Sequence, residues 1–192
     1  MKKLLILLFS VFSFSVFSQE FKKPSEGKSM VYFVRTTSLG FLINFKYFDN
    51  EKYLGKFNYG KYIAYECEPG KHLFWSKSEN IDFIEAELEA NKIYIIDSEP
   101  QMGAIKAGVK LVPFVDNVSN FKNEKKYLKT RNNIISSITE KKEFILNKDS
   151  SDQDDQESDY TSLIKKSIER YNERKSKNKE ITQITNNMYL NN

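Results

Sequence analysis

The sequence predicts a mainly β fold, an antiparallel β-sandwich of about seven strands followed by a C-terminal helical extension. Three observations support this prediction. Between residues 29 and 113, Tyr, Phe, Ile and Val occur in short groups separated by turn residues, which is typical of strands. Over residues 84–89, apolar and acidic residues alternate, which indicates a strand with one buried face and favours antiparallel pairing. After Pro113, the composition changes to Lys, Asn, Glu and Ser with isolated aliphatic residues.

Turn residues divide the β region into its expected strands. We expect these over residues 29–35, 42–48, 52–57, 61–66, 72–77, 81–88, 92–96 and 105–111. Asn50 can adopt a left-handed backbone, so residues 49–51 predict a tight reversal. Pro69 presets its φ and Gly70 accepts a positive φ, so residues 68–71 predict a type II turn that leads His72 into its strand.

Helices are expected after the strands. Apolar residues at loose helical spacing predict a helix or helix pair over residues 119–146. A second helix is predicted over residues 160–177, with Asp159 as its N-cap, because one apolar stripe contains Tyr160, Leu163, Ile164, Ile168 and Tyr171. Three alternatives remain open for this helix: packing on the sheet, a half-folded tail, and a position on a membrane surface. We favour packing against protein, because the stripe lacks Trp and Phe and an acidic run precedes it.

The first eighteen residues predict an export signal. Lys2 and Lys3 precede an apolar run over residues 4–17, and residues 16–18 resemble a cleavage site. A membrane-spanning anchor is the alternative, but a span needs about 20 apolar residues and serines interrupt this run. Position 19 is Gln19 and not cysteine, so no lipid anchor is expected there. We therefore expect a periplasmic, outer-envelope associated or secreted protein without a transmembrane segment in its mature chain.

These features divide the chain into consecutive segments. They are a signal peptide (1–18), an N-terminal lead-in (19–27), the β-sandwich domain (28–115), a helical segment (116–148), an acidic linker (149–159), and a basic amphipathic helix with its tail (160–192). The linker is predicted from residues 149–159, which are polar and acidic without an apolar residue and cannot bury enough surface to order themselves.

The net charge argues against a nucleic-acid-binding protein, and the cysteine content excludes a protein stabilised by intramolecular disulfide bonds. Removal of residues 1–18 takes away Lys2 and Lys3, which lowers the formal net charge from +4 to +2, so general binding to nucleic acid is not expected. Cys67 is the only cysteine, so the chain cannot form an intramolecular disulfide bond. We expect Cys67 to be buried in a strand; pairing with another chain is the alternative and would require exposure.

Several short motifs resemble the DUF2846 family of exported bacterial proteins of unknown function. They are Tyr53-Leu54-Gly55, Gly60-Lys61-Tyr62, residues 68–72 (EPGKH) and residues 88–94 (LEANKIY), and the resemblance covers residues 28–112. It implies an antiparallel sandwich and supplies no catalytic residues. Asn91 stands where the family tends to have glycine, and Asn tolerates the left-handed backbone that such a turn needs. Ile95 stands where a second tyrosine is common.

Candidate site residues are few. His72 is the only histidine, which excludes paired-histidine metal sites, and we interpret it with Pro69 and Gly70 as part of a structural turn. Tyr59 and Tyr62 are the leading candidates for a surface that contacts a partner. Trp75 is a further candidate, although core packing is the favoured interpretation of its large ring. We expect no cofactor and no bound metal ion.

The predicted function follows from the leader, the turns and the lack of a catalytic motif. We expect a non-catalytic module that binds another envelope protein. The alternative is a protein that binds a small ligand or a glycan, or an enzyme that acts on glycans through carboxylates on the strands, with Asp82, Glu85 and Asp97 as candidates.

Overall fold

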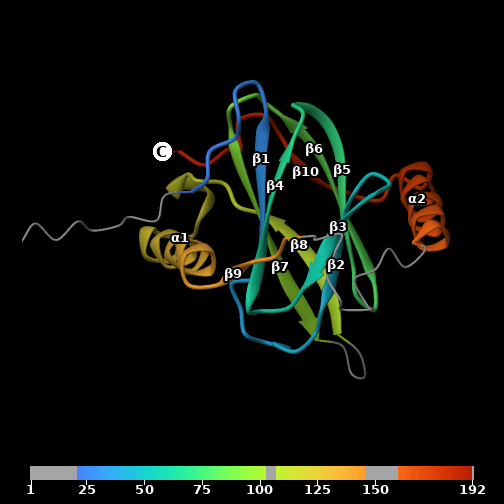
Figure 1. Cartoon of the computed structure of the whole chain (residues 1–192), viewed down its shortest axis with the longest axis horizontal. Coiled ribbons are helices and arrows are strands. Elements are labelled where there is room, and N and C mark those ends of the chain that lie inside the picture. The colour runs from blue at the N-terminus through green and yellow to red at the C-terminus, as the bar shows by residue number, and fades with distance from the viewer. Residues whose placement is uncertain (1–20, 103–106, 146–159, 192) are drawn as a thin grey trace, which may run out of the picture.

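The computed structural model describes residues 21–102, 107–145 and 160–191 (Figure 1). The predicted signal peptide, residues 1–18, and the predicted acidic linker, residues 149–159, lie outside the described residues. The described part of the chain is mainly β, with ten strands in two five-stranded sheets and two α-helices. The predicted β class is therefore confirmed.

The first sheet, here called the β1 sheet, has the order β8-β7-β1-β4-β9. Its strands are β1 (Ser29–Val34), β4 (Lys61–Cys67), β7 (Ile93–Met102), β8 (Ala107–Pro113) and β9 (Lys142–Glu143). In this sheet β1 pairs with β4 in antiparallel orientation and with β7 in parallel orientation. The central strand β1 is completely buried along its length.

The second sheet, here called the β2 sheet, has the order β10-β6-β5-β2-β3. Its strands are β2 (Phe45–Asp49), β3 (Lys52–Phe57), β5 (Gly70–Lys77), β6 (Ile81–Leu88) and β10 (Thr182–Ile184). Asn50, in the turn between β2 and β3, has a φ of 51°, and Gly70, which begins β5 where the chain crosses from β4 of the other sheet, has a φ of 114°. Asn91, in the turn before β7, has a φ of 63°, so an asparagine does adopt the left-handed backbone there.

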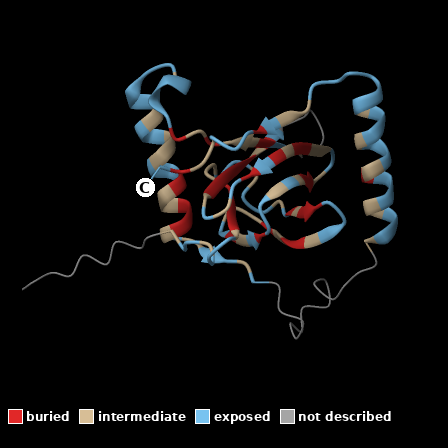
Figure 2. Cartoon of the chain, turned by 90° about the horizontal axis from the view of Figure 1, so that it is seen from above, coloured by how far each residue is buried: buried red, intermediate tan, exposed pale blue. Residues whose placement is uncertain are grey.

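The inner faces of the two sheets share one hydrophobic core. In β6, Ile84, Ala86 and Leu88 enter this core whereas Glu85 and Glu87 do not, as the alternation in the sequence predicts. Aromatic side chains from both sheets meet in it; the ring centroids of Phe33 on β1 and Phe74 on β5 lie 5.5 Å apart. The buried residues accordingly lie in the middle of the molecule, between the two helices (Figure 2).

The predicted number and orientation of the strands are wrong. Three of the pairings, β1 with β7, β4 with β9 and β6 with β10, are parallel, so both sheets are mixed. Alternation along a strand shows that one of its faces is buried, but the direction of its neighbour depends on connections that local sequence does not specify. The short strands β9 and β10 have too few apolar residues to be recognised in the sequence.

Helix α1 (Glu124–Thr139) covers the outer face of the β1 sheet. Its side chains Ile134 and Ile138 pack with Tyr32 and Tyr62 of that sheet in a second apolar cluster. A short 3-10 helix, η1 (Val118–Asn120), precedes α1. The Asn123 side chain caps the first turn of α1. The helical segment is therefore shorter than predicted: α1 ends at Thr139, and the chain continues as strand β9.

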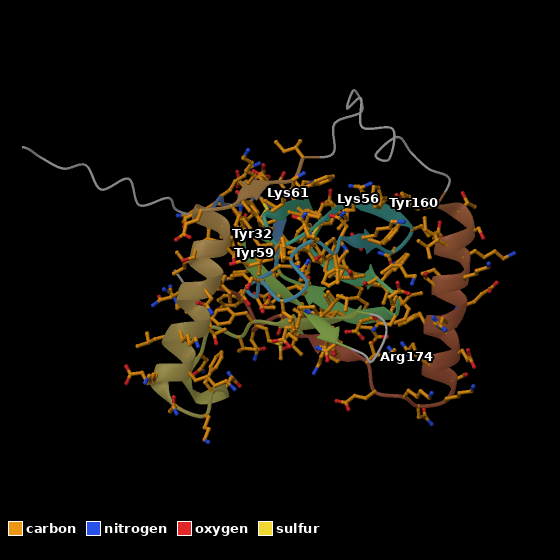
Figure 3. All side chains as sticks on the ribbon, turned by 90° about the horizontal axis from the view of Figure 1, so that it is seen from below. Tyr32, Lys56, Tyr59, Lys61, Tyr160 and Arg174 are labelled. Atoms are coloured by element: carbon orange, nitrogen blue, oxygen red, sulfur yellow. The ribbon has the colours of Figure 1, made fainter. Side chains whose placement is uncertain are left out.

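Helix α2 (Thr161–Ser176) covers the outer face of the β2 sheet. It runs across the strands from Tyr160 to Arg174 (Figure 3). The predicted apolar stripe of α2 packs against a third cluster, formed by Phe48, Leu73, Trp75 and Phe83. Tyr160 itself occupies the N-cap position, and Asp159 lies outside the described residues. The tail helix thus packs against protein, the alternative that the sequence favoured.

The segment after α2 returns to both sheets. β10 pairs with β6, and the Leu190 amide donates a hydrogen bond of 2.8 Å to the carbonyl oxygen of Ile93. Cys67, at the end of β4, is a buried free cysteine, as predicted. None of the described helices is long and apolar enough to cross a membrane.

Candidate functional site

The three aromatic residues predicted as a partner surface lie at separate places. Tyr62 is buried under α1, and Trp75 is buried under α2, on the outer faces of opposite sheets. Tyr59 is half-buried in the turn between β3 and β4, where the Lys141 ammonium group lies 3.7 Å from the centre of its ring. These residues therefore do not form one exposed surface, because α1 covers Tyr62 and α2 covers Trp75.

His72 is held by the turn that Pro69 and Gly70 form. Its Nδ1 lies 2.8 Å from Asp49 Oδ2 on the neighbouring strand, and its Nε2 lies 2.8 Å from the Glu68 carbonyl oxygen. Burial lowers the pKa of His72, but the hydrogen bonds and the Asp49 charge outweigh this effect and raise the pKa to about 10. His72 is therefore a cation at neutral pH, with both ring N–H groups donated to fixed acceptors.

This arrangement gives His72 a structural role. A general base needs a free ring nitrogen to accept a proton, and neither nitrogen of His72 is free. The Tyr65 hydroxyl of the β1 sheet donates a hydrogen bond of 3.0 Å to the same Asp49 oxygen, so the group links the two sheets. The interpretation of residues 69–72 as a structural turn fits this geometry.

The three carboxylates considered for glycan chemistry are bonded to protein groups at different places. Asp82 accepts a hydrogen bond of 2.8 Å from the Leu111 amide, and Glu85 lies 2.8 Å from Lys175 of α2. The Lys175, Tyr171 and Gln183 side chains lower the pKa of Glu85 to about 2. Asp97 is buried in the other sheet, and burial raises its pKa although Thr36 opposes this effect. These acids do not converge on one reaction centre.

Two surface cavities of about 350 Å³ flank the C-terminal segment. One lies between the N-terminal lead-in and the turn before β7, and the other lies beside η1; Tyr189 and Asn191 line both. Neither contains Asp82, Glu85 or Asp97. Among the described residues, no three His, Cys, Asp or Glu side chains are placed to hold a metal ion.

The connection between β1 and β2 is the clearest candidate for a contact surface. We call this segment, Thr36 to Asn44, the apolar loop; it contains no charged residue. It lies at the lower end of the two sheets in Figure 1. The exposed fractions of Leu39, Phe41 and Leu42 are 48%, 58% and 72%. Neighbouring large apolar side chains that remain in water mark a site of interaction more often than a structural need.

Arg35, at the end of β1, holds the apolar loop in one shape. This side chain is completely buried, and its guanidinium group donates hydrogen bonds of 2.6 Å to the Ile43 carbonyl and 2.9 Å to the Leu39 carbonyl. A third bond, of 3.2 Å, reaches the Gly40 carbonyl. The guanidinium carbon also lies 4.4 Å from the centre of the Phe45 ring. One planar side chain thus fixes three carbonyl groups of the loop.

Both ends of the apolar loop are fixed as well. At its start, Thr36 donates hydrogen bonds from its amide and its hydroxyl to the Asp97 carboxylate of β7. At its end, the partly buried Ile43 packs against the central core. Lys141, which follows α1, donates a hydrogen bond to the Arg35 carbonyl, and burial lowers its pKa to about 8. The loop is therefore ordered, with Ile43 directed inward and Leu39, Phe41 and Leu42 exposed.

The sequence contains a signal for this loop, an uncharged run, which the search for strands does not detect. Residues 42–48 predict a strand because they are apolar and aromatic, but β2 begins only at Phe45. The absence of charge over residues 36–45, which follows directly on an arginine, distinguishes the segment from an ordinary polar connection. The burial of Arg35 itself has no signature in the sequence, since arginine is rarely buried completely.

Comparison of the chain with protein-family models, with curated proteins and with solved structures gave no match.

Proposed function

We propose that this chain is an exported, non-catalytic module of the bacterial cell envelope, and that it docks on another envelope component through the apolar loop. Export is the expectation from residues 1–18, and the resemblance to the DUF2846 family of exported proteins agrees with it. The observation that carries the proposal is the braced loop, in which a buried arginine holds three exposed apolar side chains in place.

The bonding of the titratable groups supports a non-catalytic role. His72 uses one ring nitrogen on the Glu68 carbonyl and the other on Asp49 of β2, whereas Asp82 is bonded to the backbone of β8 and Glu85 to α2. Groups that do chemistry must be free to bind substrate or exchange protons. In the described residues these groups instead hold elements of the fold together.

The bracing of the loop supports a docking role. A flexible loop loses conformational entropy when it binds, whereas a loop held in its bound shape does not, so rigidity increases affinity. Surface apolar side chains without a role in the fold cost solubility and are usually replaced by polar ones. Leu39, Phe41 and Leu42 lie on an ordered loop, which is the combination that favours recognition.

Fractionation of cells tests docking through the loop. The full chain is expressed in bacterial cells, and its share in the envelope fraction is compared with that of a variant carrying Leu39→Ser, Phe41→Ser and Leu42→Ser. A matched control carries Val118→Ser and Leu128→Ser, which change two other exposed apolar residues, each 46% exposed. We expect the wild type and the control in the envelope fraction and the loop variant in the soluble fraction. Equal fractionation of all three proteins would refute docking through the loop.

Mass spectrometry of the same material tests export separately. Cleavage after Ser18 gives a mature chain that begins at Gln19. Recovery of the intact leader on the exported protein would refute the cleavage proposal, whatever the loop variants do.

A further inference from the structure

Part of the backbone of the apolar loop is paired within the protein. The Leu39, Gly40 and Ile43 carbonyl oxygens accept hydrogen bonds from Arg35, and the Ile43 amide donates a hydrogen bond of 2.9 Å to the Gly40 carbonyl. The Leu39 amide is 3.3 Å from the Thr37 hydroxyl. A backbone group that leaves water unpaired costs several kcal/mol, so pairing within the protein is the condition for entry into an apolar phase.

We propose that the apolar loop inserts Leu39, Phe41 and Leu42 into a lipid surface. This inference rests on the proposed function and identifies the envelope component on which the module docks. The three side chains are exposed, uncharged and close in sequence, and backbone groups of Leu39, Gly40 and Ile43 in the same loop are paired within the protein. Leucine and phenylalanine gain free energy on transfer from water to hydrocarbon in proportion to the apolar area they bury.

The size of the loop favours lipid over a protein partner. A stable protein interface needs about 800 Å² on each partner and some 20–30 residues. The apolar loop spans only Thr36 to Asn44, and two lysines lie near it in the described chain: Lys46 on β2, and Lys61 at the start of β4. A lipid surface needs no complementary area beyond the side chains that enter it.

The charges around the loop are mixed in sign. Lys61 and Lys142 lie opposite each other on β4 and β9, and Lys61 is labelled in Figure 3. Glu140 and Glu143 flank Lys142 in sequence and are exposed. With Lys46 and Lys141, lysines outnumber glutamates around the loop, so anionic headgroups should strengthen binding at low salt. Apolar burial drives insertion itself, which should therefore persist on neutral lipid and at high salt.

The tail helix is not available for the same role. Leu163, Ile164 and Ile168 of α2 pack against the β2 sheet, so the stripe that could have lain on a membrane is already buried against protein. We therefore assign the lipid contact that the sequence left open for the tail to the loop between β1 and β2.

Vesicle flotation tests the proposal. The purified chain without residues 1–18 contains every described residue and lacks the apolar leader, which would itself bind lipid. It is mixed with vesicles of phosphatidylcholine alone and of phosphatidylcholine with phosphatidylglycerol, at low and high salt. We expect flotation with both, and a partition coefficient about a hundredfold or more lower for the variant with Leu39→Ser, Phe41→Ser and Leu42→Ser. The Val118→Ser, Leu128→Ser control should float like the wild type.

A second variant reports insertion directly. Leu42→Trp places a fluorescent ring on the loop, and we expect vesicles with bromine on the lipid acyl chains to quench it, whereas the buried Trp75 of the unchanged chain is not quenched.

The outcomes separate this inference from the proposed function. Absence of flotation, or flotation that the loop variant retains, would overturn insertion into lipid. If the loop variant nevertheless leaves the envelope fraction in cells, docking through the loop stands and its partner is a protein. If neither experiment distinguishes the loop variant, both proposals fail.

Discussion

The Tyr65 hydroxyl of the β1 sheet donates a hydrogen bond of 3.0 Å to Asp49 of the β2 sheet. The same carboxylate oxygen lies 2.8 Å from Nδ1 of His72. The Asn50 side chain donates a hydrogen bond of 2.9 Å to the other oxygen of Asp49. A buried carboxylate therefore links two layers whose shared core is apolar. Three donors satisfy Asp49, so the loss of one leaves a buried acceptor only partly paired.

Replacement of Tyr65 by phenylalanine should lower stability. Tyr65→Phe removes the hydrogen bond to Asp49 but keeps the aromatic ring, so we expect the free energy of unfolding to fall by about 1–2 kcal/mol. Urea denaturation measures this difference. Tyr59→Phe is the control, because the contact of Tyr59 in the described structure is made by its ring and not by its hydroxyl. A loss at Tyr65 no larger than the loss at Tyr59 would show that the link between the sheets contributes nothing.

The charge on His72 should make stability fall at alkaline pH. Its pKa is about 10 in the folded protein, above the value of about 6.5 in an unfolded chain, so the folded state binds the extra proton. The stabilisation is complete below pH 6.5 and is lost as the pH rises through about 10, with a slope of up to about 1.4 kcal/mol per pH unit. Unfolding by urea between pH 6 and 10 measures it, and His72→Gln should remove this part of the slope. If the unfolding free energies of the wild type and His72→Gln changed in parallel with pH, the extra proton would not belong to His72.

Replacement of Arg35 should loosen the apolar loop. Arg35→Lys keeps the charge but loses the planar group that reaches three carbonyls, so we expect stability to fall by about 2 kcal/mol or more. Hydrogen exchange and limited proteolysis over residues 36–44 should both accelerate. The control is Arg131→Lys, since Arg131 is partly exposed and lies 3.4 Å from Asp116, where replacement should cost under about 1 kcal/mol. Unchanged proteolysis of the loop in Arg35→Lys would show that the guanidinium group does not brace it.

Trp75 should report the docking of α2. It is the only tryptophan, is completely buried, and stacks on Phe48 with 3.8 Å between ring centroids. Ile164→Asp places a charge in the contact between α2 and the sheet and should weaken that contact by about 2 kcal/mol or more. We expect Trp75 emission to move to longer wavelength, because water reaches the ring. Lys166→Asp, on an exposed position of the same helix, should leave the emission unchanged; a shift of equal size in this control would mean that charge alone is responsible.

Features set by a few neighbouring residues could be predicted from the sequence. Asn50, Gly70 and Asn91 have positive φ, β6 alternates as expected, and the apolar stripe of α2 faces the protein. Each depends on backbone geometry or on periodicity within one element, which local sequence determines.

Features that depend on distant contacts could not be predicted. The parallel pairing of β1 with β7 joins residues more than sixty positions apart, and no local pattern specifies it. The candidate site was missed for the same reason. Leu42 and Ile43 are apolar enough for a strand, and only the tertiary position of Arg35 explains why they form a braced loop.

The pairing of β10 with β6 has a consequence for the order in which the chain can assemble. Gln183 bonds to Glu85 across a separation of 98 residues, so the edge of β6 stays open until the chain has been made as far as β10. A nascent chain that ends before β10 leaves the backbone groups on this edge of β6 without a neighbouring strand, and such an edge can pair with another chain. The β2 sheet is therefore protected against pairing between chains only once the segment after α2 has docked.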